Sequence, residues 1–195
     1  VRLMNSPYPH DVNAGGKPLT IRLITRQDAA ALEAFAHRLP LHDLLFLARD
    51  IRNPRVIAAW LDQAENGQIR SLLAVDESGI HACTALVRDE LSWSPHVAEI
   101  RVLIDPALRG TGIGKVLAAE CVEMAREAGV EKLFVRLTPD QAGALKLFED
   151  MGFRPEALLR DHVRDANGET HDILIMALNL SRHEAQPQVY GMAGD

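Results

Sequence analysis

The stretch AEIRVLIDPALRGTGIG, residues 98–114, decides the fold of this chain. Its first part, residues 98–104, is rich in aliphatic and β-branched side chains and predicts a strand. Three glycines follow in five positions, and apolar residues then recur at helical spacing over residues 116–125. The stretch therefore predicts a strand that enters a helix through a glycine-rich turn.

This turn is suited to hold an anionic ligand such as a diphosphate. Gly110, Gly112 and Gly114 allow the dihedral angles that point several backbone N–H groups into one concavity, and they let a ligand approach closely. The helix adds its unpaired first amides and the positive end of its dipole, while Arg109 and Lys115 add formal charge. We therefore expect an anion at the start of this helix.

Two common nucleotide-binding loops do not fit this spacing. A dinucleotide fingerprint has glycines at G-x-G-x-x-G and an acidic residue at the end of the next strand, whereas this turn reads G-x-G-x-G and the next strand ends near Arg136 and Thr138. A P-loop has glycine where Arg109 stands and serine or threonine where Val116 stands. Neither the dinucleotide fingerprint nor the P-loop therefore matches the glycine-rich turn.

The patterns on either side of residues 98–114 predict a single mixed α/β domain over residues 18–181. The expected order is β-α-α-β-β-β-α-β-α-β-β. The expected strands lie at about 19–23, 71–75, 80–87, 98–104, 132–137, 153–163 and 170–178, and the helices at about 29–39, 54–65, 113–128 and 141–151. Residues 1–17 and 182–195 are polar or contain Gly and Pro, and we expect them to be flexible tails.

Composition limits the partners that we expect. The chain has 195 residues and a formal net charge of -6, which argues against nucleic acid or an anionic membrane as a partner. It has no signal-peptide pattern and no apolar run near the ~18 residues of a membrane span, so we expect a cytoplasmic protein. The histidines lack the spacing of zinc ligands, and we expect no metal.

Two segments together resemble a known superfamily. Residues 98–106 and 109–114 resemble the acetyl-CoA motif of the GNAT N-acetyltransferases, and the element order agrees with that superfamily over about residues 19–179. A later helix of the superfamily usually reads Asn, Ala, Leu, Tyr, Gly and Phe at the spacing found here in Gln141, Ala144, Leu147, Phe148, Gly152 and Phe153. The resemblance implies an N-acetyltransferase with acetyl-CoA as co-substrate, which moves the acetyl group to a primary amine by direct attack in a ternary complex.

The resemblance also implies where the co-substrate binds. Residues 102–104 should splay away from the strand at 132–137, so that free strand amides bind pantetheine and an N–H near Leu103 or Ile104 stabilises the developing oxyanion. The diphosphate should lie against the glycine-rich turn. The expected co-substrate-binding residues are Val102, Leu103, Ile104, Arg109, Gly110, Thr111, Gly112, Ile113, Gly114, Lys115, Gln141 and Phe148.

The resemblance implies a candidate for the base but none for the acid. Glu99 is the candidate base, because it matches an acidic residue of bacterial protein-lysine acetyltransferases of the superfamily; the alternative is a glutamate that faces solvent or pairs with Arg101. Many members carry a tyrosine general acid where this chain has Phe148, which leaves the acid unassigned. Ribosomal-protein N-terminal acetyltransferases carry a glutamate where this chain has Arg136.

Two functions remain open from the sequence. The acceptor of an active enzyme is either a protein lysine or a small amine. The other function is an acyl-CoA-binding sensor or scaffold with weak catalysis, which the phenylalanine at position 148 favours. We expect a monomer or a homodimer, with the last hairpin as an available edge.

Overall fold

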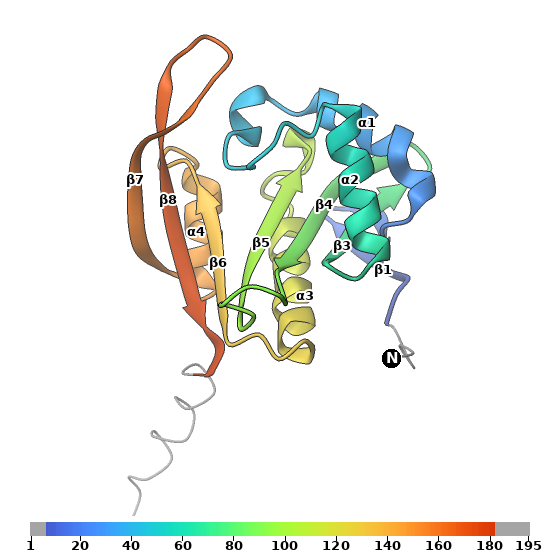
Figure 1. Cartoon of the computed structure of the whole chain (residues 1–195). Helices are drawn as coiled ribbons and strands as arrows, with labels where there is room; N and C mark the ends of the chain where they lie inside the picture. Colours follow the sequence, from blue (N-terminus) through green and yellow to red (C-terminus); the bar gives the residue numbers. More distant parts are fainter. Residues whose placement is uncertain (1–6, 182–195) are drawn as a thin grey trace, which may run out of the picture.

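The fold is one 8-stranded sheet with helices on both faces (Figure 1). The computed structural model describes residues 7–181. The strand order is β1-β2-β3-β4-β5-β6-β8-β7, and β5 and β6 are the only neighbours in this sheet that run parallel. Helices α1 and α2 cover one face, and α3 and α4 cover the other. The predicted single mixed α/β domain is confirmed.

The elements follow the predicted order closely. The strands are β1 (His10–Ala14), β2 (Lys17–Leu23), β3 (Ile69–Asp76), β4 (Gly79–Arg88), β5 (Val97–Ile104), β6 (Lys132–Leu137), β7 (Arg154–Arg164) and β8 (Thr170–Asn179). The α-helices are α1 (Ala29–Arg38), α2 (Pro54–Glu65), α3 (Ile113–Glu127) and α4 (Ala142–Asp150). Three short 3-10 helices join them: η1 (Arg26–Asp28), η2 (Leu41–Leu44) and η3 (Pro106–Leu108).

The N-terminal segment departs from the prediction. Strand β1 pairs antiparallel with β2 along their full overlap, from His10 opposite Ile21 to Ala14 opposite Lys17. The prediction of a flexible tail over residues 1–17 is therefore wrong from residue 10 onward. Strand β1 has only 5 residues and little apolar character, and its order comes from hydrogen bonds to β2. Residues 1–6 and the predicted tail 182–195 lie outside the described residues.

Capping side chains fix the starts of the first two helices. Asn53 Oδ1 accepts a hydrogen bond from the Arg55 amide at 3.0 Å, and Pro54 occupies the first helical position of α2, as predicted. Thr25 and Asp28 form a capping box in the 3-10 turn that leads into α1. These local contacts hold α1 and α2 where they can pack over one face of the sheet.

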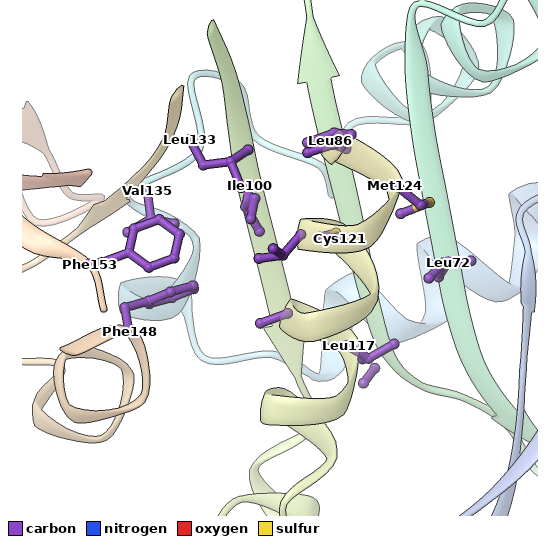
Figure 2. Close-up of a cluster of buried hydrophobic side chains, with 14 of the residues drawn as sticks. Leu72, Leu86, Ile100, Leu117, Cys121, Met124, Leu133, Val135, Phe148 and Phe153 are labelled. Atoms are coloured by element: carbon purple, nitrogen blue, oxygen red, sulfur yellow. The ribbon is translucent and has the colours of Figure 1, made fainter. Parts of the chain in front are cut away.

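The core has two parts, one on each face of the sheet. On the α3 and α4 face, Leu117 and Cys121 of α3 pack against strand residues such as Ile100, and Phe148 of α4 packs edge-on against Phe153 (Figure 2). Helices α1 and α2 enclose the other part against β3, β4 and β5. Among residues 7–181, no helix is long and apolar enough to cross a membrane.

Candidate active site

Strands β5 and β6 diverge midway along their length. They pair in parallel at three positions, from Val97 opposite Lys132 to Glu99 opposite Phe134, and the ladder ends there. Beyond Glu99, β5 remains paired with β4 and β6 remains paired with β8. The ribbons separate toward the C-terminal ends of both strands (Figure 1). The sheet therefore opens at the position where the sequence predicted a splay.

A cleft of about 1010 Å³ occupies this opening, and we call it the cofactor cleft. Its walls come from the diverging halves of β5 and β6, the glycine-rich turn, α4 and the segment around η2. Ten of the predicted site residues line it: Val102, Leu103, Ile104, Arg109, Gly110, Gly112, Gly114, Lys115, Gln141 and Phe148.

Three predicted site residues do not line the cofactor cleft. Thr111 donates its hydroxyl to the Leu108 carbonyl at 2.7 Å and thereby closes the turn. Ile113, the first residue of α3, is buried in the core. Glu99 is buried at the end of the cleft where the strands join. Thr111 and Ile113 thus shape the turn from behind, while Glu99 lies behind the cleft wall.

Positions 112 and 114 of the turn require glycine for different structural reasons. Gly112 has φ +90° and precedes α3, and a Cβ atom built there would meet nothing within 4 Å, so it would project into open space. Gly114 lies inside the first turn of α3, where a Cβ atom would approach Ile104 Cδ1 to 2.6 Å. Gly112 keeps the concavity open, whereas Gly114 lets α3 pack closely against β5.

The segment around η2 lines part of the cofactor cleft. Asp43 forms an ion pair with Arg109 of the glycine-rich turn. His42 Nε2 lies 2.7 Å from Asp140 Oδ2, just before α4. One short segment therefore contacts both loops that border the cleft. The sequence did not predict the role of these residues, because no local periodicity or motif reports contacts between positions as far apart as 43 and 109 or 42 and 140.

Glu99 is held by two arginines. Its side chain is 7% exposed, and Oε2 accepts hydrogen bonds from Arg101 Nε at 3.1 Å and Nη2 at 2.6 Å. Arg136 Nε lies 3.7 Å from Oε1, and in the described part of the chain neither of these two buried atoms has a hydrogen-bond partner. Glu99 thus pairs with Arg101, which was one of the alternatives that the sequence left open. Arg136 also lines the cofactor cleft, so this arginine borders that space and lies close to Glu99 as well.

Phe148 lines the cofactor cleft but belongs mainly to the core. It is 3% exposed, and its ring centroid lies 5.2 Å from that of Phe153 at an interplanar angle of 69°. The ring has no proton to donate. At this position the chain supplies apolar packing for α4 and an apolar wall for the cleft.

The known relatives of this chain are acetyltransferases. Residues 31–153 match the model of the acetyltransferase (GNAT) family. A Salmonella typhimurium [ribosomal protein bS18]-alanine N-acetyltransferase is 26% identical over 165 residues, which cover 83% of this chain and 98% of the relative. A Salmonella typhimurium L-methionine sulfoximine/L-methionine sulfone acetyltransferase is 25% identical over 174 residues, which cover 86% of this chain and 98% of that protein.

Solved structures share the fold. The structure of a ribosomal-protein-alanine N-acetyltransferase from Brucella melitensis has a TM-score of 0.69 and 25% identity, covering 82% of this chain and 99% of its own. A Salmonella typhimurium acetyltransferase solved with its cofactor acetyl-CoA has a TM-score of 0.70 and 20% identity, covering 83% and 94%. The chain therefore belongs to the acetyltransferase (GNAT) family and is an acetyl-CoA-dependent N-acetyltransferase that acts on amines.

Proposed function

We propose that the chain transfers the acetyl group by direct attack of a primary amine in a ternary complex, with Glu99 as the proton acceptor. The observation that carries this proposal is the position of Glu99. It is the last residue of the parallel ladder, so its carboxylate lies where β5 and β6 begin to separate. A group bound in the cofactor cleft and extending to its inner end would approach this carboxylate.

The residues of the cofactor cleft fit coenzyme A. The glycine-rich turn and the first amides of α3 would hold the diphosphate, with Lys115 beside it. Arg109 would exchange its ion pair with Asp43 for the phosphate oxygens. Backbone amides near Leu103 and Ile104, on the edge of β5 that leaves β6, would bind pantetheine and polarise the acetyl carbonyl. Acetyl-CoA supplies the thioester that the amine attacks.

Glu99 would remove the proton that the amine must lose. An amine with an ordinary pKa of about 10 is mostly protonated at neutral pH, so it gives one proton to solvent before the attack and a second proton to an acceptor as the amide forms. Arg101 holds Glu99 Oε2, and Oε1 faces only Arg136 within the described structure. We infer that Arg136 moves aside when the amine binds, which brings Oε1 into contact with the amine.

The leaving group does not require an acid from the protein in this scheme. A thiol has a pKa near about 8.5, so the coenzyme A thiolate is a tolerable leaving group without a donated proton. Phe148, in the place where a tyrosine acid stands in many members of the superfamily, would then serve packing alone. Glu99 is the one titratable side chain that this scheme requires.

The acceptor is either a protein lysine or a small amine, and the relatives include one enzyme named for the alanine of a protein and one named for small amines. The protein is a ribosomal protein, and the small amines are methionine derivatives. A monomer or homodimer, a cytoplasmic location, and the absence of a metal and of nucleic-acid or membrane partners stay predictions.

The proposal is tested by an acceptor screen with acetyl-CoA, in which products are identified by mass spectrometry. The panel contains amino acids, polyamines, aminoglycosides and lysine peptides. We expect at least one primary amine to gain an acetyl group, with no acetyl group retained on the protein. Tight acetyl-CoA binding without amine acetylation would favour a sensor or scaffold instead. Acetyl-enzyme that forms before the amine is added would contradict direct attack.

A further inference from the structure

A second cavity lies beside the cofactor cleft, on the face covered by α2. It has a volume of about 270 Å³ and lies between α2, the loop at residues 47–51, and strands β4 and β5. Leu103 of β5 lines both this second cavity and the cofactor cleft. The two spaces are therefore neighbours across one strand residue. A small molecule in the second cavity would lie next to the place where the strands separate.

The walls of the second cavity combine apolar and polar surface. Trp60 contributes its ring, and Ile51 and Val56 add aliphatic surface. The Trp60 Nε1 atom donates a hydrogen bond to Ser71 Oγ at 2.8 Å, so the indole polar group is already satisfied. The remaining ring surface offers apolar contact. These walls suit a compact hydrophobic side chain.

The charged residues that line the second cavity are both arginines, Arg49 and Arg101. Arg49 is exposed and forms no ion pair with any residue from 7 to 181. Arg101 uses Nε and Nη2 to bind Glu99, while no hydrogen bond engages its Nη1 within the described structure. Guanidinium groups bind carboxylates well and repel a cationic group. The second cavity is thus complementary to an anion.

The arginines also determine how close such an anion would lie to Glu99, the proposed base. Arg101 contacts Glu99 directly, and Glu99 faces Arg136 of the cofactor cleft. A carboxylate on Arg101 would therefore place the rest of its molecule close to Glu99. An amine attached one carbon away from that carboxylate could reach the inner end of the cleft.

We propose that the second cavity selects the acceptor, and that this acceptor is a small amine with a carboxylate and a compact apolar side chain, such as an apolar α-amino acid. The inference rests on the proposed acetyl transfer and adds its substrate class. The ammonium group first loses a proton to solvent. The neutral amine nitrogen then bonds to the acetyl carbon, the carbon–sulfur bond breaks, the proton that the nitrogen loses goes to Glu99, and the thiolate leaves. The acceptor carboxylate stays on Arg49 and Arg101 and takes no part in bond changes.

The test compares methionine with methioninamide, which differ in the carboxylate alone. We expect kcat/KM for coenzyme A release to be at least about 10-fold higher with methionine, because charge-assisted hydrogen bonds to Arg49 and Arg101 are lost with the amide. Removing the carboxylate lowers the pKa of the amine and makes the amide intrinsically more reactive. A preference for the acid would therefore come from binding. Calorimetry with protein saturated with coenzyme A should show that methionine also binds more tightly than methioninamide.

Matched variants assign this preference to the second cavity. Arg49→Gln should reduce the ratio of methionine to methioninamide at least about 3-fold, with unchanged affinity for acetyl-CoA. Arg101→Gln should reduce the ratio as well and also lower kcat for both amines, because Arg101 orients Glu99. Arg55→Gln, on the exposed side of α2 and outside the cavity, should leave the ratio unchanged.

Three results would overturn the inference while leaving acetyl transfer intact. They are equal or better use of the amide, a ratio that Arg49→Gln does not change, and faster acetylation of lysine peptides than of any carboxylated small amine. Failure to acetylate any amine at all would instead contradict the proposed function itself.

Discussion

Glu99 closes the parallel ladder between β5 and β6, and two guanidinium groups offset its negative charge. The residue types alone predicted a carboxylate near the gap. They did not reveal that Arg136, from the neighbouring strand, lies close to this carboxylate and also lines the cofactor cleft. That arrangement depends on the parallel register of two strands about thirty residues apart, which no local pattern reports.

The role of Glu99 predicts a specific kinetic effect. Glu99→Gln keeps the shape of the side chain but removes the proton acceptor, so kcat should fall about 10²-fold or more. The dissociation constant of acetyl-CoA, measured by calorimetry, should stay nearly the same, because Glu99 does not line the cofactor cleft. Glu77→Gln, in the exposed β3–β4 turn, is the control. A variant with wild-type kcat would exclude Glu99 as the base.

Gly112 provides a test of the glycine-rich turn. Gly112→Val should weaken acetyl-CoA binding, because the Cβ branch would enter the concavity. The backbone at φ +90° also disfavours valine by about 1–3 kcal/mol of unfolding free energy. Gly129→Val, beyond the other end of α3 at φ +69°, carries similar backbone strain away from the cleft. Equal acetyl-CoA affinity in the two variants, measured by calorimetry, would contradict the assignment of the turn.

The two cysteines should be unreactive in the folded protein. Burial raises the pKa of both Cys83 and Cys121 to about 12, so almost no thiolate exists at neutral pH. A thiol reagent should therefore label neither residue until the chain unfolds in denaturant. Rapid labelling of the native protein at pH 8 would show that the enclosing layers open. The same protection means that released coenzyme A can be measured with thiol reagents.

At the scale of elements, most of the fold was predictable because its signals are local. Asn53 with Pro54 and the period of the apolar residues marked α2, and the Asn167-Gly168 turn marked the hairpin of β7 and β8. Strand β1 was missed because its order comes from pairing with β2. The second cavity was missed because it forms between α2 and two strands that follow later in the chain.

The entry into α1 depends on a charged contact that should respond to pH. Burial tends to raise the pKa of Asp28, but hydrogen bonds from Arg22 and Thr25 outweigh it and hold that pKa below its usual value. A lowered folded-state pKa means that this contact stabilises the protein above the unfolded-state pKa of about 3.9. The stabilisation is then lost as the pH falls through the lower folded-state pKa.

Asp28→Asn should therefore lower the free energy of unfolding at pH 7 by about 1–3 kcal/mol, because Arg22 loses a charged partner. Urea unfolding of both proteins at pH 7, 5 and 3 measures the difference. We expect it to be constant between pH 7 and 5 and to shrink below pH 4. If the difference in the free energy of unfolding instead grew as the pH fell, the ionised carboxylate would not stabilise this turn. Asp150→Asn, at the exposed end of α4, is the control.

At the scale of the whole molecule, the cofactor cleft and the second cavity lie next to each other in the sheet. The cofactor cleft opens where β5 leaves β6, and the second cavity lies across Leu103 on the α2 face. Glu99 and its arginines occupy the boundary between them. A donor in one space and an acceptor in the other could then meet without a covalent enzyme intermediate.

Initial rates of coenzyme A release, with acetyl-CoA and methionine both varied, test this account most directly. Transfer in a ternary complex predicts release that depends on the amine and double-reciprocal plots that intersect, because both substrates must be bound before the bond changes occur. Parallel lines would indicate an acetyl-enzyme intermediate. Release that is independent of every amine tested would contradict the account.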